Sequence, residues 1–396
     1  MRNRVTHATL ALLLVTIALA LDVQPGSAHK PITSPYTYND DVYPILRDRC
    51  GTCHVSGGVA PMSLMTHADA VPWGESIRTE ILAGHMPPAT VDEAPTRFRN
   101  APGLSPREMN LLLTWVTGGT PIGSPDKDPQ PMTRAAAWPL GQPDVTLQLP
   151  TESVVGPDER ERTVEYIVPT GTTERRWLRA VDLLPGTAAM VRAATIALRA
   201  PASAAEGTER MLALWLPGED PVALDAGFGF ELPASAELVV RVLYRKTWEY
   251  ERKELRDRST VGLYFATAPA TGVQALRLAP DYTAVATPER FAFRRVLTDD
   301  LRALAIYPEA GLNNASVKIV ATRPDKTRAD LIAFHPRRDW SRRYWFREPI
   351  QLPRGTTIEV TVLFDDEAPL SPLSLSPAAA TRPDLSSMRL TLNVVP

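Results

Sequence analysis

The chain has 396 residues, of which 44% are hydrophobic and 22% charged, and its formal net charge at pH 7 is −2. This composition is ordinary for a globular protein with enough chain for more than one core, and it lacks the basic footprint of a nucleic-acid-binding protein. Proline is abundant, at 38 residues, which disfavours long helices and favours turns, edge strands and extended connections.

The first 28 residues have the pattern of a secretory signal peptide. Arg2 and Arg4 give a positive start, residues 8–21 form a mostly apolar run, and small residues precede a cleavage point near Ala28. The apolar run is short and interrupted for a membrane span. We therefore expect export to the periplasm.

Residues 31–127 have the apolar spacing of several short helices. Ser105 is a suitable N-cap, with Pro106 in the first turn and Glu108 placed to complete a capping box. Residues 128–143, which are rich in proline and polar side chains, predict a linker. The helices are expected at residues 41–49, 66–71, 73–83 and 105–117.

The first of these helices leads into Cys50-Gly51-Thr52-Cys53-His54. Cys-x-x-Cys-His is the attachment sequence for c-type haem, in which both thiols add to the haem vinyl groups and the histidine ligates the iron. Cys50 and Cys53 are the only cysteines in the chain. We expect one covalent haem c on Cys50 and Cys53 with His54 as the proximal ligand, and hence a metal-binding cytochrome c.

Two other readings of the motif fit the sequence less well. A thioredoxin-like redox pair would need a βαβ pattern around it and gives no reason for His54. A zinc site would need a second pair of ligands at suitable spacing, and the sequence offers none.

The expected distal iron ligand is Met86. It lies 32 residues after His54, between His85 and Pro87-Pro88, where the prolines favour a stiff extended loop. His85 is the main alternative, and an open sixth position is another. The remaining candidates are Met62, Met65, His67 and Met109.

From Val145 onward the period of the apolar residues changes from about four to two, which is typical of strands. Short strands separated by proline, glycine and aspartate turns favour β-sandwiches. We expect two, at residues 144–270 and 271–396. The strands are expected at residues 145–149, 164–168, 177–183, 211–216, 237–246, 260–265, 301–307, 316–322, 331–335, 356–364 and 388–395.

Two parts of the chain resemble one family. Residues 36–126 are similar to the haem domain fused to bacterial relatives of the copper type II, ascorbate-dependent monooxygenases, and residues 138–396 are similar to the catalytic part, which has the peptidylglycine α-hydroxylating monooxygenase fold. The resemblance implies a multidomain protein with a small all-α cytochrome c domain followed by two all-β jelly-roll sandwiches. The matching stretches are Cys50–His54, Gly57–Pro61, Pro72-Trp73, Met86–Pro88, Trp115-Val116, Pro143–Val145, Pro185-Gly186, Trp215–Gly218, Gly229-Phe230, Leu232-Pro233, Val261–Phe265, Pro353–Thr356 and Phe364-Asp365.

That family uses two copper sites, one on each sandwich, and the resemblance places their ligands at positions that are not histidine here. The positions are Arg192, Ala193 and Leu243 for the first site and Glu309, Gly311 and Met388 for the second. Met388 corresponds to a methionine ligand of the family, and its single thioether does not hold copper. Copper is therefore not expected, and the monooxygenase activity does not carry over.

The sequence thus predicts a periplasmic c-type cytochrome that transfers single electrons through a His/Met haem, with the β region as a docking or structural module. A redox partner protein is expected, and a place as a subunit of a larger oxidoreductase complex would fit. The alternative is an enzyme, either a haem-fused copper monooxygenase with unrecognised ligands or a haem oxidoreductase with an open iron position.

Overall fold

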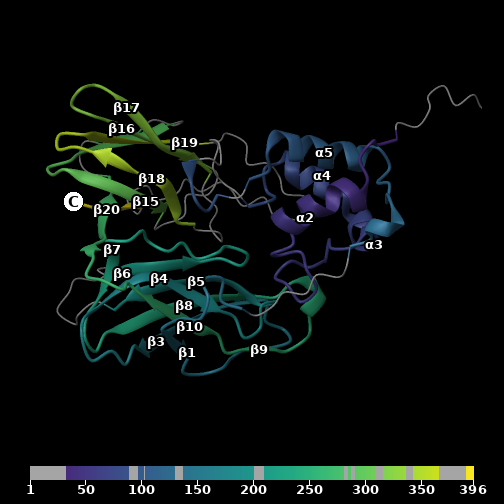
Figure 1. The fold of residues 1–396 in the computed structure, drawn as a ribbon, viewed down its shortest axis with the longest axis horizontal. Coiled ribbons are helices and arrows are strands. Elements are labelled where there is room, and N and C mark those ends of the chain that lie inside the picture. Colours follow the sequence, from purple (N-terminus) through teal and green to yellow (C-terminus); the bar gives the residue numbers. More distant parts are fainter. Residues whose placement is uncertain are drawn as a thin grey trace, which may run out of the picture.

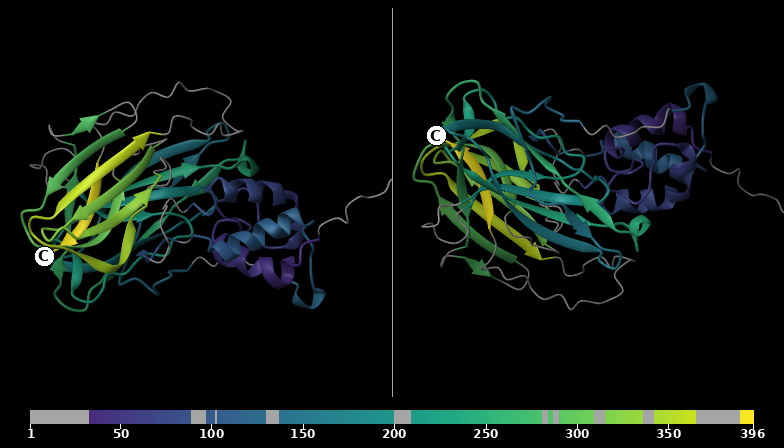
Figure 2. Two further views of the ribbon diagram at one scale, coloured as in Figure 1. Left: turned by 90° about the horizontal axis from the view of Figure 1, so that it is seen from above. Right: turned by 90° about the horizontal axis from the view of Figure 1, so that it is seen from below.

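The structure is a computed structural model, which describes residues 33–88, 97–101, 103–129, 137–199, 209–280, 284–286, 290–308, 315–335, 342–364 and 389–396. Strands make up 42% of the described residues and helices 16%. Figure 1 shows the helices gathered at one end, beside two β units, and both views of Figure 2 place them at that same end. The expected signal peptide, residues 1–28, lies outside the described residues.

Side chains cap two of the four described α-helices, α3 (His67–Ala70) and α5 (Pro106–Thr117). Ser105 Oγ accepts the N–H of Glu108, and the Glu108 carboxylate accepts the N–H of Ser105 at 2.7 Å, so the expected capping box is confirmed. Thr66 accepts the N–H of Asp69 at 3.1 Å in a similar cap. The helices are α2 (Tyr43–Arg49), α3 (His67–Ala70), α4 (Gly74–Leu82) and α5 (Pro106–Thr117), with a π-helical turn at Tyr38–Val42 and 3-10 turns at Val71–Trp73 and Pro125–Lys127.

The apolar faces of these helices share a small core built around aromatic rings. Trp115 and Tyr38 are fully buried, with ring centroids 5.9 Å apart. The Tyr38 hydroxyl donates to the Leu64 carbonyl oxygen at 2.7 Å, which satisfies its only polar atom inside the core. Leu46 of α2 packs in the same core and fixes the helix that leads to Cys50.

The first β unit contains two sheets that share one hydrophobic core. Its strands are β1 (Val145–Gln148), β3 (Glu161–Pro169), β4 (Arg176–Leu184), β5 (Val191–Leu198), β6 (Arg210–Trp215), β7 (Phe228–Leu232), β8 (Glu237–Arg245), β10 (Thr260–Phe265) and β11 (Thr271–Gly272), with β2 (Ser153–Val155) and β9 (Leu255–Asp257) as a separate pair. The strand orders are β1-β10-β4-β7-β11 and β3-β8-β5-β6.

The second β unit is built in the same manner. Its strands are β12 (Gln274–Leu278), β13 (Val285–Ala286), β14 (Arg290–Val296), β15 (Leu301–Pro308), β16 (Ala315–Thr322), β17 (Arg328–Phe334), β18 (Tyr344–Leu352), β19 (Thr357–Phe364) and β20 (Leu390–Val395). They form sheets ordered β12-β20-β15-β18 and β13-β14-β19-β16-β17. The expectation of β-sandwiches agrees with this arrangement, whereas the expected domain boundaries stay predictions.

The expected fold class is wrong, because no all-α cytochrome c domain is present in the described residues. The helices are only 4 to 12 residues long within a chain that is mostly β. The segment that follows α4 also joins a β unit. Phe98 forms an antiparallel bridge with Phe346 of β18, and both side chains belong to the core of the second unit. The helical residues therefore form a small segment of a mostly β protein. Helices this short depend on tertiary packing for their stability.

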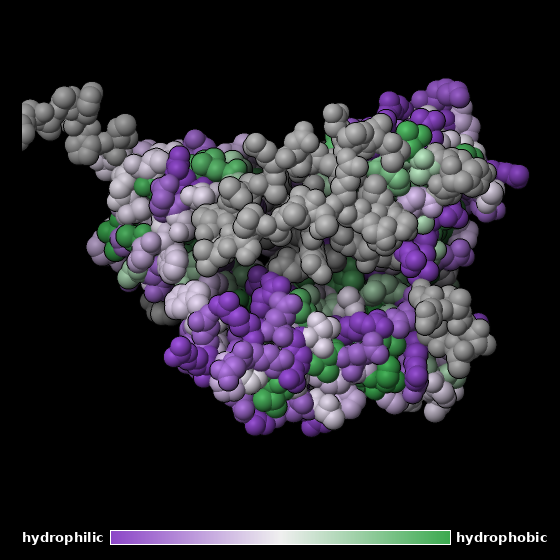
Figure 3. Space-filling model, turned by 180° about the vertical axis from the view of Figure 1, so that it is seen from behind, coloured by the Kyte–Doolittle hydropathy of each residue, from purple (hydrophilic) through white to green (hydrophobic). Residues whose placement is uncertain are grey.

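The two β units are packed together by apolar side chains. Leu304 of β15 and Trp345 of β18 belong to the second unit by sequence but are buried in the core of the first. The described surface in Figure 3 is mostly hydrophilic, with apolar side chains in scattered patches. The β units therefore provide one continuous frame beside the helical segment.

Candidate functional site

The Cys50–His54 turn begins where α2 ends. The N–H of Cys50 donates to the Leu46 carbonyl oxygen at 2.9 Å and closes the helix. The N–H groups of Cys53 and His54 then donate to the Cys50 carbonyl oxygen at 3.0 and 2.8 Å. Both cysteine side chains are half-buried, and no disulfide joins them. This tight turn brings the two thiols and the imidazole to one short stretch of backbone.

The surroundings of the turn do not fit a thioredoxin-like redox pair. The cysteines follow a helix, and the first described strand begins at Val145. Burial, together with the nearby Cys53, raises the pKa of the Cys50 thiol to about 12 against the opposing influence of Arg49. Cys50 is therefore a thiol at neutral pH, whereas disulfide exchange needs a reactive thiolate.

The His54 imidazole is held by a backbone carbonyl group. Its Nδ1 lies 3.2 Å from the Met62 carbonyl oxygen, which can only accept a hydrogen bond, so Nδ1 carries the proton and Nε2 keeps its lone pair. Burial lowers the pKa of His54, the bond to Met62 opposes this shift, and the charge of Arg192 adds to it. A neutral imidazole with a fixed tautomer is the form that binds a metal.

The loop after His54 folds back over the turn. The N–H of Ala60 donates to the Cys53 carbonyl oxygen at 3.2 Å, and the N–H of Leu64 donates to that of His54 at 3.0 Å. Gly58 lies so close that a Cβ there would overlap the Cys53 carbonyl oxygen. Glycine at this position is thus a steric requirement of the turn.

Met86 and its rival His85 lie just after α4. The half-buried Met86 donates its N–H to the Glu80 carbonyl oxygen at 3.2 Å, and His85 Nδ1 lies 3.0 Å from the Glu80 carboxylate. These described contacts attach the segment to α4 and do not join Met86 to His54. The assignment of Met86 as distal ligand therefore stays a prediction.

The other candidate ligands have structural surroundings. His67 Nε2 lies 2.8 Å from the Thr120 carbonyl oxygen, and the ring packs edge-on against Tyr38. Met65 is buried in the helical core, and Met62 and Met109 pack against it. These contacts favour core packing over iron ligation.

The three described positions of the first expected copper site do come together. Ala193 is paired with Leu243 across β5 and β8, and Arg192 lies at a register shift between Val191 and Ala193. None of these three side chains is a copper ligand. Glu309, Gly311 and Met388, which belong to the second expected site, lie outside the described residues.

The description of this chain as a metal-binding cytochrome c needs correction. The described residues contain no group of three or more histidine, cysteine, aspartate or glutamate side chains that could hold a metal ion. They also lack the all-α cytochrome fold. The turn itself brings together two free thiols and one imidazole.

Sequence reasoning missed the contact between this turn and the first β unit. Cys53 Sγ lies 3.5 Å from the Pro217 carbonyl oxygen, and Gly218 packs directly against Thr52. The two segments are more than 160 residues apart in sequence, and no local pattern signals such a contact. The match at Trp215–Gly218 was the one feature that marked this loop.

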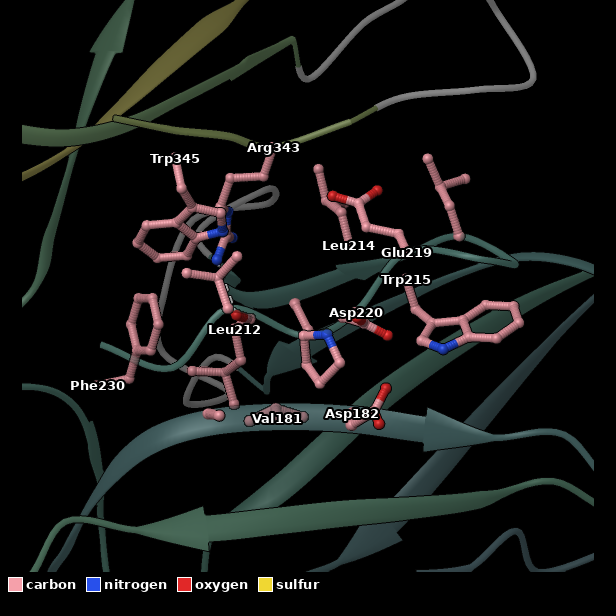
Figure 4. Close-up of a pocket in the computed structure, with 15 residues that line it drawn as sticks. Val181, Asp182, Leu212, Leu214, Trp215, Glu219, Asp220, Phe230, Arg343 and Trp345 are labelled. Carbon is pink, nitrogen blue, oxygen red and sulfur yellow. Dashed lines mark hydrogen bonds between the residues drawn. The ribbon is translucent and has the colours of Figure 1, made fainter. Parts of the chain in front are cut away.

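The loop after β6 also lines a pocket between the β units. Figure 4 shows Trp215, Glu219 and Asp220 on its wall, with Arg343 and Trp345 reaching in from the second unit. The Arg343 guanidinium donates to the Leu212 carbonyl oxygen at 2.8 Å, and it lies 5.4 Å from the Trp345 ring.

A buried ion pair closes the wall of this pocket. Glu219 pairs with Arg342 at 3.3 Å and accepts a hydrogen bond from Asn100. Burial raises the pKa of Glu219, and the charge of Arg342 opposes this shift. These charged groups are engaged with one another and connect three distant segments of the chain.

Comparisons with known proteins do not place this chain in a family. No family model matches the chain, and no curated protein matches it. Among solved structures, an α-L-fucosidase from Bacteroides ovatus is 10% identical with a TM-score of 0.18, covering 54% of this chain and 34% of the fucosidase. Allantoicase from Saccharomyces cerevisiae is 9% identical with a TM-score of 0.18, covering 59% of this chain and 77% of the allantoicase.

The chain thus spans about a third of the length of the fucosidase that it matches. TM-scores this low support no argument about fold, reaction or substrate. The resemblance to the monooxygenase family gains nothing from these comparisons and stays a prediction. Among the described residues, no helix has the length and apolar character needed to cross a membrane.

Proposed function

We propose that this chain is exported to the periplasm, carries one haem bound covalently through Cys50 and Cys53, and exchanges single electrons with a partner protein. Thioether bonds to the two cysteines would hold the porphyrin, and His54 Nε2 would hold the iron on one side. When bound, the haem supplies reversible one-electron chemistry.

The orientation of His54 carries this proposal. Its Nδ1 is committed to the Met62 carbonyl oxygen, and both cysteines lie in the same hydrogen-bonded turn. A hydrogen-bond acceptor on Nδ1 fixes the imidazole ring and makes Nε2 a better ligand. The protonated state of the Cys50 thiol also fits slow covalent attachment better than rapid thiol exchange.

Met86 is proposed as the distal ligand, because a thioether favours ferrous iron and leaves no open position for a small molecule. The β units are proposed as the docking or structural module, and a larger oxidoreductase complex is a suitable setting. Copper chemistry has no support at Arg192, Ala193 and Leu243, which meet without a copper ligand among them.

The direct test is covalent haem retention. Protein purified from the periplasm of a strain able to mature c-type haem should keep its haem after full denaturation. Its mass should increase by that of one haem, and metal analysis should find one iron per chain. The Cys50→Ser, Cys53→Ser double variant should lose it entirely. Wild-type protein that is produced in this strain and carries no covalent haem would rule out the proposal.

The distal ligand has its own test. Met86→Ala should abolish the weak near-red band of methionine–iron ligation and allow ferrous protein to bind carbon monoxide rapidly. His85→Ala is the matched control, because His85 is held by Glu80, and it should leave both properties unchanged. Reversal of these two results would assign the position to His85.

A further inference from the structure

The turn that holds Cys53 lies against one end of the first β unit. Cys53 Sγ is 3.5 Å from the Pro217 carbonyl oxygen. A Cβ on Gly218 would overlap the Thr52 side chain and would lie 3.3 Å from Cys53 Sγ. One edge of the attachment turn is therefore covered by protein rather than by water.

Arg192 lies at this same end of the unit. Ala194 of β5 is opposite Trp215 of β6, so the residues just before Ala194 lie beside those that follow Trp215. The register shift at Arg192 is a bulge, and bulges redirect a side chain away from the regular ladder. The antiparallel pairing of β5 and β6 therefore places Arg192 near Pro217, whose carbonyl oxygen contacts Cys53 Sγ.

A fixed positive charge near the iron favours the reduced state. Ferrous iron carries one positive charge less than ferric iron, so a nearby cation repels it less. Exclusion of water from the haem edge acts in the same direction, because low polarity disfavours the more highly charged state. Both effects depend on groups that the β unit supplies.

We propose that Arg192, together with the Pro217-Gly218 cover over Cys53, raises the reduction potential of the attached haem. The inference rests on the proposed function and deepens it. Arg192 is a tuning residue that acts through charge, and Gly218 is a positioning residue that permits the close approach. The β unit is then part of the redox centre as well as a docking module.

The test is a spectroelectrochemical titration of the mature protein. Arg192→Gln should decrease the ratio of ferrous to ferric haem at a fixed potential by about tenfold, equivalent to about 59 mV for one electron. Arg192→Lys should restore part of the ratio. Arg199→Gln is the charge-matched control at the other end of β5, where Arg199 pairs with Glu237, and it should leave the ratio unchanged. An unchanged ratio in Arg192→Gln would overturn the assignment to Arg192.

Gly218→Ala tests the cover. Gly218 has φ +79°, and its Cβ would meet Thr52 and Cys53, whereas Gly227 has φ +91° with open space around its Cβ. Gly227→Ala therefore carries the same kind of backbone strain without the contact. Only Gly218→Ala should lower the ratio of ferrous to ferric haem. Equal effects of the two variants would overturn the role of the cover.

A haem-free measurement separates this inference from the proposed function. In unmatured protein, Gly218→Ala should increase the rate at which a maleimide labels Cys53 by several-fold over Gly227→Ala. If wild-type protein never acquires haem while this difference holds, the proposed function fails but the contact stands. If haem is present and neither the labelling rate nor the potential responds, the inference fails alone.

Discussion

The polar side chains of the helical segment and those between the β units differ in how deeply they are buried. In the helical segment, Cys50, Cys53 and His54 are half-buried at the edge of a small core, where part of each side chain can be reached. In the β units, the charges between the sandwiches are enclosed, with Arg342 and Arg343 only 4% and 3% exposed. Their partners are other parts of the same chain.

This difference distinguishes groups that are available for chemistry from groups that hold the frame. Arg343 has three aromatic rings and two backbone carbonyls around its guanidinium, including Tyr307 at 4.8 Å and the Met211 carbonyl oxygen at 3.1 Å. A side chain so enclosed has little left to offer a ligand. The Cys50–His54 turn is covered along one edge only, and the His54 imidazole has a fixed tautomer.

The sharpest test of this distinction compares two histidines of the same segment. His54→Ala should remove the proximal ligand and abolish the low-spin ferric spectrum of mature protein. His67→Ala removes a hydrogen bond to Thr120 and an aromatic contact, so it should retain the spectrum and lose about 1–2 kcal/mol of unfolding free energy. Absorption spectra and urea titrations measure the two effects. Loss of the spectrum in His67→Ala alone would reverse the two roles.

The next largest effect is expected inside the frame. Arg343→Met should lower the free energy of unfolding by about 3 kcal/mol, because two buried carbonyls lose their donor and three rings lose a cation. Arg302→Met is the exposed counterpart, with one ring, Phe228, at 5.2 Å and one carbonyl partner, Pro396. It should cost less than about 1 kcal/mol. Equal losses of unfolding free energy in urea titrations would show that the enclosure of Arg343 does not contribute to stability.

Local signals predicted several elements well. The strand expected at residues 260–265 matches β10, and the one at 237–246 differs from β8 by a single residue. The capping box at Ser105 was also visible, since caps depend on residues three positions apart. Such features need no knowledge of the rest of the chain.

Other elements were missed. β18 was not predicted, because Arg347-Glu348-Pro349 interrupts its alternation, yet it forms because it is an edge strand, where proline is tolerated. β14 was missed although Phe291 and Phe293 lie two residues apart between Arg290 and Arg294. The bridge from Phe98 to Phe346 is non-local, so the all-α expectation could not be corrected from the sequence.

The Cys-x-x-Cys-His motif could be recognised in the sequence because it lies within five residues. The Nδ1 acceptor on Met62 and the cover over Cys53 could not, because each needs the fold to bring a distant backbone oxygen close. Arg192 was interpreted only as a former copper position, and its place near Pro217 follows from the pairing of β5 with β6.

A smaller effect should come from the helix cap that supports the Cys50–His54 turn. Glu108 completes the α5 capping box and also pairs with Arg49, the residue before Cys50, at 3.0 Å. Ser105→Ala should cost about 1 kcal/mol of unfolding free energy. Ser124 precedes a 3-10 turn in the same segment without a side-chain cap, so Ser124→Ala should change stability by less than about 0.5 kcal/mol. Equal losses in thermal or urea unfolding would show that the capping box is not what stabilises α5.

The smallest effect concerns an exposed contact between the two ends of the helical segment. Hydrogen bonds from the Lys127 ammonium, the Ser124 N–H and the Thr37 hydroxyl lower the pKa of Asp40 to about 2. Because the folded pKa lies below the unfolded one, the stabilisation is present above about pH 4 and is lost as the pH falls toward 2. Asp40→Asn should therefore reduce the slope of the unfolding free energy against pH between these values. The reduction should correspond to less than one bound proton, and Lys127→Ala should produce part of it. Urea titrations across this range measure the slope. A decline as steep in Asp40→Asn as in the wild type would show that this contact, like most exposed ion pairs, contributes little to the folded state.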